Sequence, residues 1–273
     1  MSEVPIPLLS VSSSLKQGGI FTVEKAGAAA KSKRVKGPVS LCDLAKEHNL
    51  KQLHIVASNW VDFMVAHKNL KEIGCQLVFG LKLVVCENLA DKTDGSFKSE
   101  SKVIIWMNGD GAADYQALIN IFSVAANDGF YYTPRIDWKT LAAMWHKDLI
   151  LSLPYYSSFL ARNTLTFSSI VPSFPEGVKP LILKEIGQEL AIDQLIEPVV
   201  ARYVEAEKLE VQPVKSIYYK KRDDARQFQT WRCVLSRTTW DKPNDSMTSR
   251  EFSWEAYKEI LTALPIAQPT STA

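Results

Sequence analysis

Hydrophobic and polar positions follow two alternating patterns along this chain of 273 residues. Short apolar runs are typical of buried β-strands, and they occupy residues 4–11, 52–57, 75–86, 103–107, 149–153 and 211–219. Apolar positions three and four residues apart are typical of helices, and they occupy residues 41–48, 61–73 and 192–204 and the stretches after Asp114 and Asp137. Strands that alternate with helices predict an α/β sheet or barrel with short parallel strands.

Local signals predict where several of these elements begin and end. Ser40 and Asp43 resemble a capping box, and Asp114 and Asp137 are candidate N-caps of the two central helices. The Asn-Gly-Asp-Gly sequence at residues 108–111 predicts a tight turn. Pro198 is expected in the first turn of its helix or at a kink, because proline lacks the amide hydrogen that the helix interior needs.

The chain shows neither an internal repeat nor a stretch long enough to link two domains, so we expect a single domain over residues 1–273. Residues 24–37 are rich in Ala, Lys and Gly and predict an exposed basic loop. Residues 205–273 are expected to form the final strand and a C-terminal layer that mixes aromatic and basic side chains.

Composition and charge narrow the functional classes. The chain is 46% hydrophobic and carries a formal net charge of +2, so any basic site must be local. Its most apolar stretch is shorter than the roughly 18 residues of a membrane span, and the N-terminus has no basic region of a signal peptide. We therefore expect a cytoplasmic protein without a membrane partner. The four cysteines lie far apart without a Cys-x-x-Cys pair, which predicts buried thiols rather than a zinc site.

Motifs of known catalytic chemistry are missing from the sequence. The four histidines form neither a His-x-His nor a His-Glu-x-x-His motif, and the glycines at 109 and 111 lack the third glycine and the Lys-Ser/Thr of a phosphate loop. No Gly-x-Ser-x-Gly nucleophile motif occurs. Residue types and spacing therefore identify no catalytic residue.

The sequence DGFYYTPRID at residues 128–137 resembles a signature of the PHP (polymerase and histidinol phosphatase) domain of bacterial DNA polymerase III alpha subunits. The resemblance extends in order through most of the chain, including residues 74–83, 102–115, 149–152 and 217–234. It implies a distorted seven-stranded (β/α) barrel. In that family the strand ends carry metal ligands for phosphoester hydrolysis.

At the positions that match this family's metal ligands, the chain carries other residues. Ser12 stands at the nearest position to the His-x-His motifs, Ser58 and Asn59 at the Thr-Asp-His-Gly motif, and Lys82 at a glutamate. Lys102 stands at another histidine, and Lys215, Ser216 and Tyr218 at the last motif, so Lys215 is expected in the same pocket. A lysine beside a divalent cation costs about 8 kcal/mol at 4 Å and an effective dielectric constant near 20. We therefore predict a degenerate pocket that holds no metal and no other cofactor.

Three hypotheses for function follow. The first is a catalytically inactive scaffold that docks a protein partner, such as a replication polymerase or exonuclease, in a phage or mobile element. The second is a nucleic-acid or anion binder that uses a pocket lined by Lys82, Lys102 and Lys215. A possible binding surface combines basic and aromatic residues: Lys215, Lys220, Lys221, Arg222, Trp231 and Trp240. The third is a metal-dependent phosphoesterase or exonuclease with a rearranged site of Asp110, Asp114 and Asp128.

Overall fold

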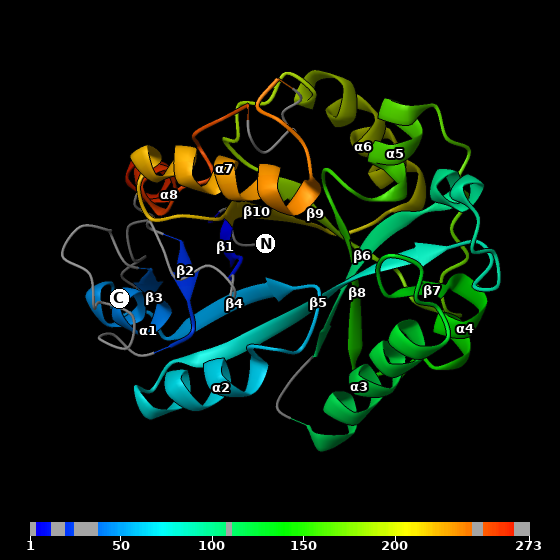
Figure 1. The fold of residues 1–273 in the computed structure, drawn as a ribbon, viewed down its shortest axis with the longest axis horizontal. Helices are drawn as coiled ribbons and strands as arrows, with labels where there is room; N and C mark the ends of the chain where they lie inside the picture. The colour runs from blue at the N-terminus through cyan, green and yellow to red at the C-terminus, as the bar shows by residue number, and fades with distance from the viewer. Residues whose placement is uncertain (1–3, 12–19, 25–37, 108–110, 242–247, 265–273) are drawn as a thin grey trace, which may run out of the picture.

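Seven strands close into a barrel at the centre of the molecule (Figure 1). The computed structural model describes residues 4–11, 20–24, 38–107, 111–241 and 248–264. In order around the barrel the strands are β4 (Gln52–Ala57), β1 (Ile6–Leu9), β10 (Val211–Ile217), β9 (Leu181–Glu185), β8 (Leu149–Pro154), β6 (Ser101–Met107) and β5 (Gln76–Cys86), and β5 pairs with β4 again. The predicted α/β barrel of seven strands is confirmed.

One strand of the barrel runs against all the others. Strand β6 pairs antiparallel with both β5 and β8, whereas the remaining neighbours pair parallel. As a result, β6 begins at the end of the barrel where the parallel strands finish. A short additional strand, β7 (Arg135–Asp137), pairs with the last residues of β5, and β2 (Phe21–Thr22) pairs with β3 (Val39–Ser40) outside the barrel.

Alternate residues of each strand point into the barrel, as the two-residue period of a strand requires. Large apolar side chains fill the interior: Leu8, Ile104, Trp106, Leu183 and Val214. Gly80 leaves room for the Trp106 ring, because a Cβ atom at this position would lie 2.6 Å from it. The Trp106 indole N–H donates to Ser152 Oγ at 2.7 Å, so this indole is both packed and hydrogen-bonded inside the barrel.

Helices cover the outside of the barrel in two groups (Figure 1). One group packs on the strands through a core that contains Leu118, Leu141, Phe159 and Ile196, and it consists of α3 (Ala112–Asn127), α4 (Trp138–Ala143), α5 (Phe159–Thr166) and α6 (Asp193–Glu207). The other group packs through a separate core, and it consists of α1 (Leu41–Glu47), α2 (Phe63–Glu72) and α8 (Trp254–Ala263).

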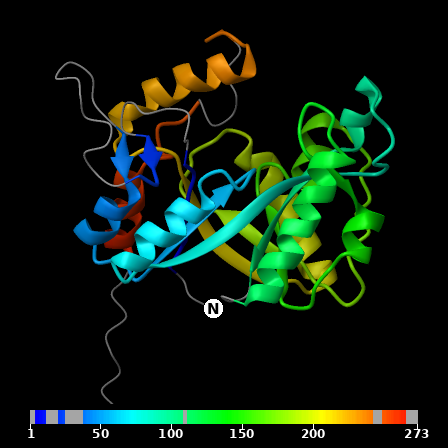
Figure 2. The same ribbon diagram turned by 60° about the horizontal axis from the view of Figure 1, so that its bottom comes forward.

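Helix α7 (Ala225–Ser236) follows the single turn η2 (Arg222–Asp224) and lies across one end of the barrel (Figure 2). Its inner side packs through Ala225 and Phe228 against Tyr219 and Phe252. None of the described helices combines the length and the apolar character that crossing a membrane requires.

Several predicted helix ends need correction. Asp137 caps α4 as expected, with its carboxylate accepting from the Thr140 amide at 2.7 Å. Asp114 instead lies inside the first turn of α3, whose N-cap is Gly111, and Ser40 precedes α1 without a side-chain capping bond. Pro198 is the sixth residue of α6 rather than part of its first turn. Residues 25–37, most of the predicted basic loop, lie outside the described part of the chain.

The segment that carries the family resemblance has a structural role. Arg135 is fully buried and donates to the carbonyl oxygens of Gly129 and Asp91, at 3.1 and 2.9 Å, and to Ser96 Oγ and Glu100 Oε1, at 3.0 and 2.9 Å. These bonds fix the connection that contains η1 (Asp94–Ser99). Gly129 is required because a Cβ atom here would lie 1.9 Å from the Arg135 carbonyl oxygen.

Candidate functional site

A pocket of about 710 Å³ opens at the end of the barrel where the parallel strands finish. Its floor and walls come from inward-facing positions at these strand ends, and the main polar contributors are Ser10, Ser58, Asn59, Lys82, Lys102, Glu185, Ser216 and Tyr218. Helix α7 adds Phe228, Trp231, Arg232 and Leu235. Parallel strands bring their carboxyl ends to one rim, so residues far apart in sequence meet here.

Most of the residues that we predicted for a degenerate pocket do line this one. Ser58, Asn59, Lys82, Lys102, Ser216 and Tyr218 all contribute to its surface, and Ser12 lies outside the described residues. That these residues stand at the positions of the family's metal ligands stays a prediction. Sequence reasoning assigned neither Glu185 nor Arg232 to the pocket. Glu185 is the last residue of β9, whose short apolar run 181–183 does not by itself predict a strand. Arg232 lies on α7, whose sequence shows no clear helical period of apolar residues.

Three cationic side chains of the pocket form no direct ion pair within the described part of the chain. Among the described residues, none of Lys82, Lys102 and Arg232 forms a side-chain hydrogen bond or an ion pair, and the buried Nε atom of Arg232 is left without a partner. Burial, assisted by the charge of Lys102, lowers the pKa of Lys82 to about 8. Desolvation and the charges of Arg232 and Arg162 lower the pKa of Lys102. The pocket therefore carries three cations that no direct ion pair within the described residues neutralises, although the Glu185 charge acts on Lys82 and Asp62 also lines the pocket.

The Glu185 carboxylate lines the same pocket as the three cations, and its oxygens already accept hydrogen bonds within the protein. They accept from the Ser216 hydroxyl, from the Ser216 amide at 2.9 Å and from Gln188 Nε2 at 2.8 Å. Burial raises the pKa of Glu185, and the three donors oppose that effect. Glu185 thus organises the end of β10 rather than pairing with a lysine.

An aromatic wall stands beside the cations. The Tyr218 ring stacks on Phe228, with ring centroids 4.8 Å apart and planes 6° apart, and on Phe252 at 5.0 Å and 22°. Burial raises the pKa of the Tyr218 hydroxyl to about 12, so the hydroxyl remains a neutral donor at physiological pH. Trp231 extends the same side of the pocket from α7.

The divalent metal ions that the family resemblance implies do not fit this pocket. Its described lining contains neither a histidine nor a cysteine, and its acids are Glu185 and Asp62. Such ions need a set of carboxylates and imidazoles, and two lysines and an arginine repel them. No step of a metal-assisted reaction can be derived for these residues.

The predicted basic surface is not a continuous one. Lys215 does not belong to it, because this side chain is fully buried and points away from the pocket, where Nζ donates to the carbonyl oxygens of Ile186 and Gly187, at 3.2 and 2.7 Å, and to Gln188 Oε1 at 3.3 Å. Lys215 and Ser216 are consecutive strand residues and must face opposite sides. The Trp231 side chain lines the pocket instead, whereas Lys221 and Trp240 are exposed.

Two further members of that predicted surface are engaged by acids. Arg222 pairs with Glu251 at 2.7 Å and with Glu259 at 2.6 Å, and Lys220 pairs with Glu47 at 2.6 Å. Their charge is therefore largely compensated within the protein.

Two of the three aspartates predicted for a rearranged phosphoesterase site do not come together in the structure. Asp114 lies in the first turn of α3 and Asp128 just after its last residue, so their Cα atoms are about 21 Å apart at 1.5 Å per residue. Asp110 lies outside the described residues. Asp114 and Asp128 cannot act on one phosphate group.

Comparison with known proteins adds little to this picture. No family model matches the chain, and no curated protein matches it either. Among solved structures, it is similar to a candidate metal-dependent phosphoesterase from Bifidobacterium adolescentis, with 10% sequence identity, a TM-score of 0.40 and coverage of 87% of this chain and 98% of that one. A similarity this low supports no conclusion about function, so we infer the chemistry of the pocket from its own residues.

Proposed function

We propose that the pocket at the strand ends binds a phosphate-bearing ligand through fixed cationic side chains, without a metal ion. The observation that carries this proposal is the convergence of Lys82, Lys102 and Arg232, which lack anionic partners among the described residues. Two like charges 4 Å apart repel by about 4 kcal/mol at an effective dielectric constant of 20. An anion that enters the pocket removes this cost.

Phosphate matches the donors of the pocket better than a carboxylate does. A phosphate group has several acceptor oxygens and more than one negative charge, and charge-assisted bonds to lysine and arginine are among the strongest hydrogen bonds in proteins. Ser58, Asn59 and the Tyr218 hydroxyl add neutral donors along the same wall. The Tyr218 ring stacks on those of Phe228 and Phe252, and both Phe rings are buried, so they form a rigid side of the pocket rather than a free stacking surface.

Binding rather than turnover is the expected outcome. Glu185 is held by three donors, so it is poorly placed to activate water, and the described lining offers no histidine as an alternative base. We therefore interpret the protein as a ligand-binding module that keeps the barrel without its hydrolytic chemistry.

Calorimetric titration of the tag-free protein tests this function. Pyrophosphate and a ten-nucleotide single-stranded DNA are the two probes, because they separate a small phosphate ligand from a nucleic acid. We expect Lys82→Met and Lys102→Met each to raise the Kd at least tenfold. The matched control, Lys68→Met on the exposed surface of α2, should leave the Kd unchanged.

The result of this titration also identifies the ligand class. A DNA affinity well above that of pyrophosphate, with a steep dependence on salt, indicates nucleic acid. Equal affinity of all three variants and the wild type for both probes would contradict the proposal.

Protein docking is a second candidate, favoured by large apolar side chains exposed at the end of α7. Val234, Leu235 and Trp240 are 71%, 54% and 47% exposed. A partner that binds them should be retained at high salt and lost from a Val234→Ser/Trp240→Ser double variant in affinity purification from the native cell. That the partner is a replication polymerase or exonuclease stays a prediction.

A further inference from the structure

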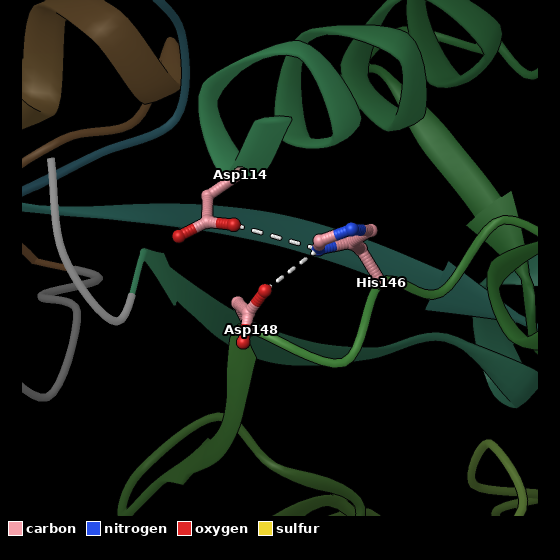
Figure 3. A group of neighbouring side chains, drawn as sticks. All are labelled: Asp114, His146 and Asp148. Carbon is pink, nitrogen blue, oxygen red and sulfur yellow. Dashed lines mark ion pairs between the residues drawn. The ribbon is translucent and has the colours of Figure 1, made fainter. Parts of the chain in front are cut away.

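A cluster of potential metal ligands lies at the opposite end of the barrel from the phosphate pocket (Figure 3). Asp114 comes from the first turn of α3, His146 from the connection between α4 and β8, and Asp148 directly precedes β8. Strand β8 starts beside this cluster and ends at Pro154 in the phosphate pocket. Six residues at 3.3 Å each separate the two places by about 20 Å.

The three side chains converge on a common point (Figure 3). His146 Nδ1 lies 3.4 Å from Asp114 Oδ1 and 3.7 Å from Asp148 Oδ2, and all three atoms lie within 4.8 Å of one another. Asp114 is held by a helix, and Asp148 by the start of a paired strand. The arrangement is therefore fixed by the fold rather than by flexible side chains alone.

Two polar groups of the cluster are left without a hydrogen bond. The Asp114 side chain is only 8% exposed, and among the described residues no group donates a hydrogen bond to it. His146 Nδ1 is buried and also has no hydrogen-bond partner. Neither Asp114 oxygen is an enclosed atom without a partner, whereas the enclosed His146 Nδ1 atom has a carboxylate on two sides and no hydrogen bond among the described residues. The carboxylate of Asp148 adds repulsion to that of Asp114. The positive end of the α3 dipole stabilises the Asp114 carboxylate in the first turn. It explains neither why the Asp148 carboxylate lies nearby nor why His146 Nδ1 has no hydrogen bond.

The distances from His146 Nδ1 to the two carboxylates distinguish direct ion pairing from three side chains that share one cation. A charge-assisted bond from an imidazolium to a carboxylate has a length of about 2.7–2.9 Å, which is shorter than both contacts of His146 Nδ1. Two ligand atoms at about 2.1 Å from one metal ion, at the tetrahedral angle, lie about 3.4 Å apart. The observed 3.4 and 3.7 Å fit this second geometry.

We propose that Asp114, His146 and Asp148 bind one divalent transition-metal ion, of the class to which zinc and manganese belong. Two carboxylates and one imidazole are a suitable donor set for these ions. His146 and Asp148 are 34% and 46% exposed, so the remaining coordination positions face solvent and take water. The bound ion would connect the start of α3 to the start of β8. This inference is independent of the phosphate pocket, and it departs from the sequence-based expectation of a chain without metal.

Titration of the tag-free, chelator-treated full chain with Zn²⁺ and with Mn²⁺ tests the site. We expect one equivalent to bind, the thermal unfolding midpoint to rise, and bound Co²⁺ to give the visible absorption of a nitrogen- and oxygen-ligated ion. His146→Gln and Asp148→Asn should each weaken binding at least tenfold. Both positions are partly exposed, so the variants should fold, which circular dichroism checks.

The matched controls are His67→Gln on α2 and Asp128→Asn after α3, which change the same residue types elsewhere. They should keep the affinity of the wild type. Absence of binding by the wild type, or equal affinity of the two cluster variants and the wild type, would overturn the metal site and leave the phosphate pocket untouched.

Discussion

Lys82 and Lys215 are both lysines of the barrel wall, but their surroundings are opposite. Burial lowers the pKa of each to about 8. Lys215 donates to three acceptors near Gly187, whereas the Lys82 ammonium has no hydrogen-bond or ion-pair partner among the described residues. The same residue type thus has a structural role on one face of the wall and is available to a ligand on the other.

Exchange of each lysine for methionine should separate these roles. We expect Lys82→Met to raise the free energy of unfolding by about 1–3 kcal/mol, because an unpaired buried charge disappears. Lys215→Met should lower it by about 2–4 kcal/mol, because three acceptors lose their donor. Urea unfolding measures both values. A similar destabilisation by both substitutions would show that Lys82 is structural.

Anion binding should depend on pH through Lys82. Below pH 8 its ammonium is charged in the free protein, so binding needs no proton. Above pH 8 binding must first protonate it, and the affinity should fall by up to tenfold per pH unit. Sulfate is the suitable probe, because its charge is constant between pH 7 and 9.5. The loss should be smaller in Lys82→Met, and a flat profile for the wild type would exclude Lys82 from the binding group.

Among the elements, the segment over residues 128–137, which carries the sequence signature, has a structural role. It contains the fully buried Arg135, which bonds to four groups on the segment between β5 and β6 and on residue 129, and the Asp137 cap of α4. None of these contacts faces the phosphate pocket. A resemblance through this segment therefore indicates the barrel fold but does not indicate an activity.

Replacement of Arg135 should test the segment directly. Lysine keeps the charge but cannot reach four acceptors that match a planar guanidinium, so we expect Arg135→Lys to lower the free energy of unfolding by about 3–5 kcal/mol. The conservative control, Arg202→Lys on the exposed side of α6, should change it by less than about 0.5 kcal/mol. Equal effects of the two substitutions would refute the role of Arg135. Chemical denaturation provides the measurement.

How far the sequence predicts each element depends on how local its signal is. Strands β5, β6 and β8 are visible as apolar runs that are largely buried on both faces, and β4 is visible as an apolar run in which alternate residues are buried. Strand β9 was missed because only its first three residues are apolar. Lys184 follows on the solvent side and Glu185 on the pocket side. Helix α7 was missed because Arg226, Arg232 and three glutamine or threonine residues obscure its period. The side to which Lys215 points depends on strand register, which only the closed barrel fixes.

For the whole molecule, the pocket at the strand ends is assembled from the ends of all seven barrel strands. Residues separated by more than 150 positions, such as Ser58 and Tyr218, contact the same volume. A ligand in this pocket should therefore stabilise the barrel as one unit.

This coupling predicts a thermal shift. At a pyrophosphate concentration of 100 times Kd, linkage adds about 2.7 kcal/mol, which corresponds to a rise of about 5–10 °C in Tm for a chain of this size. Scanning calorimetry should show a single transition that moves as a whole. A ligand-dependent shift that persists in Lys82→Met would place the anion elsewhere.

The most direct measurement is a crystal structure of the protein with bound pyrophosphate. The central claim predicts one anion at the strand ends, with its oxygens within hydrogen-bond distance of the Lys82 ammonium, the Lys102 ammonium and the Arg232 guanidinium. Glu185 should keep its bonds to Ser216. An anion that binds only at surface lysines, or a pocket in which these three cations turn away from the bound pyrophosphate, would contradict the account.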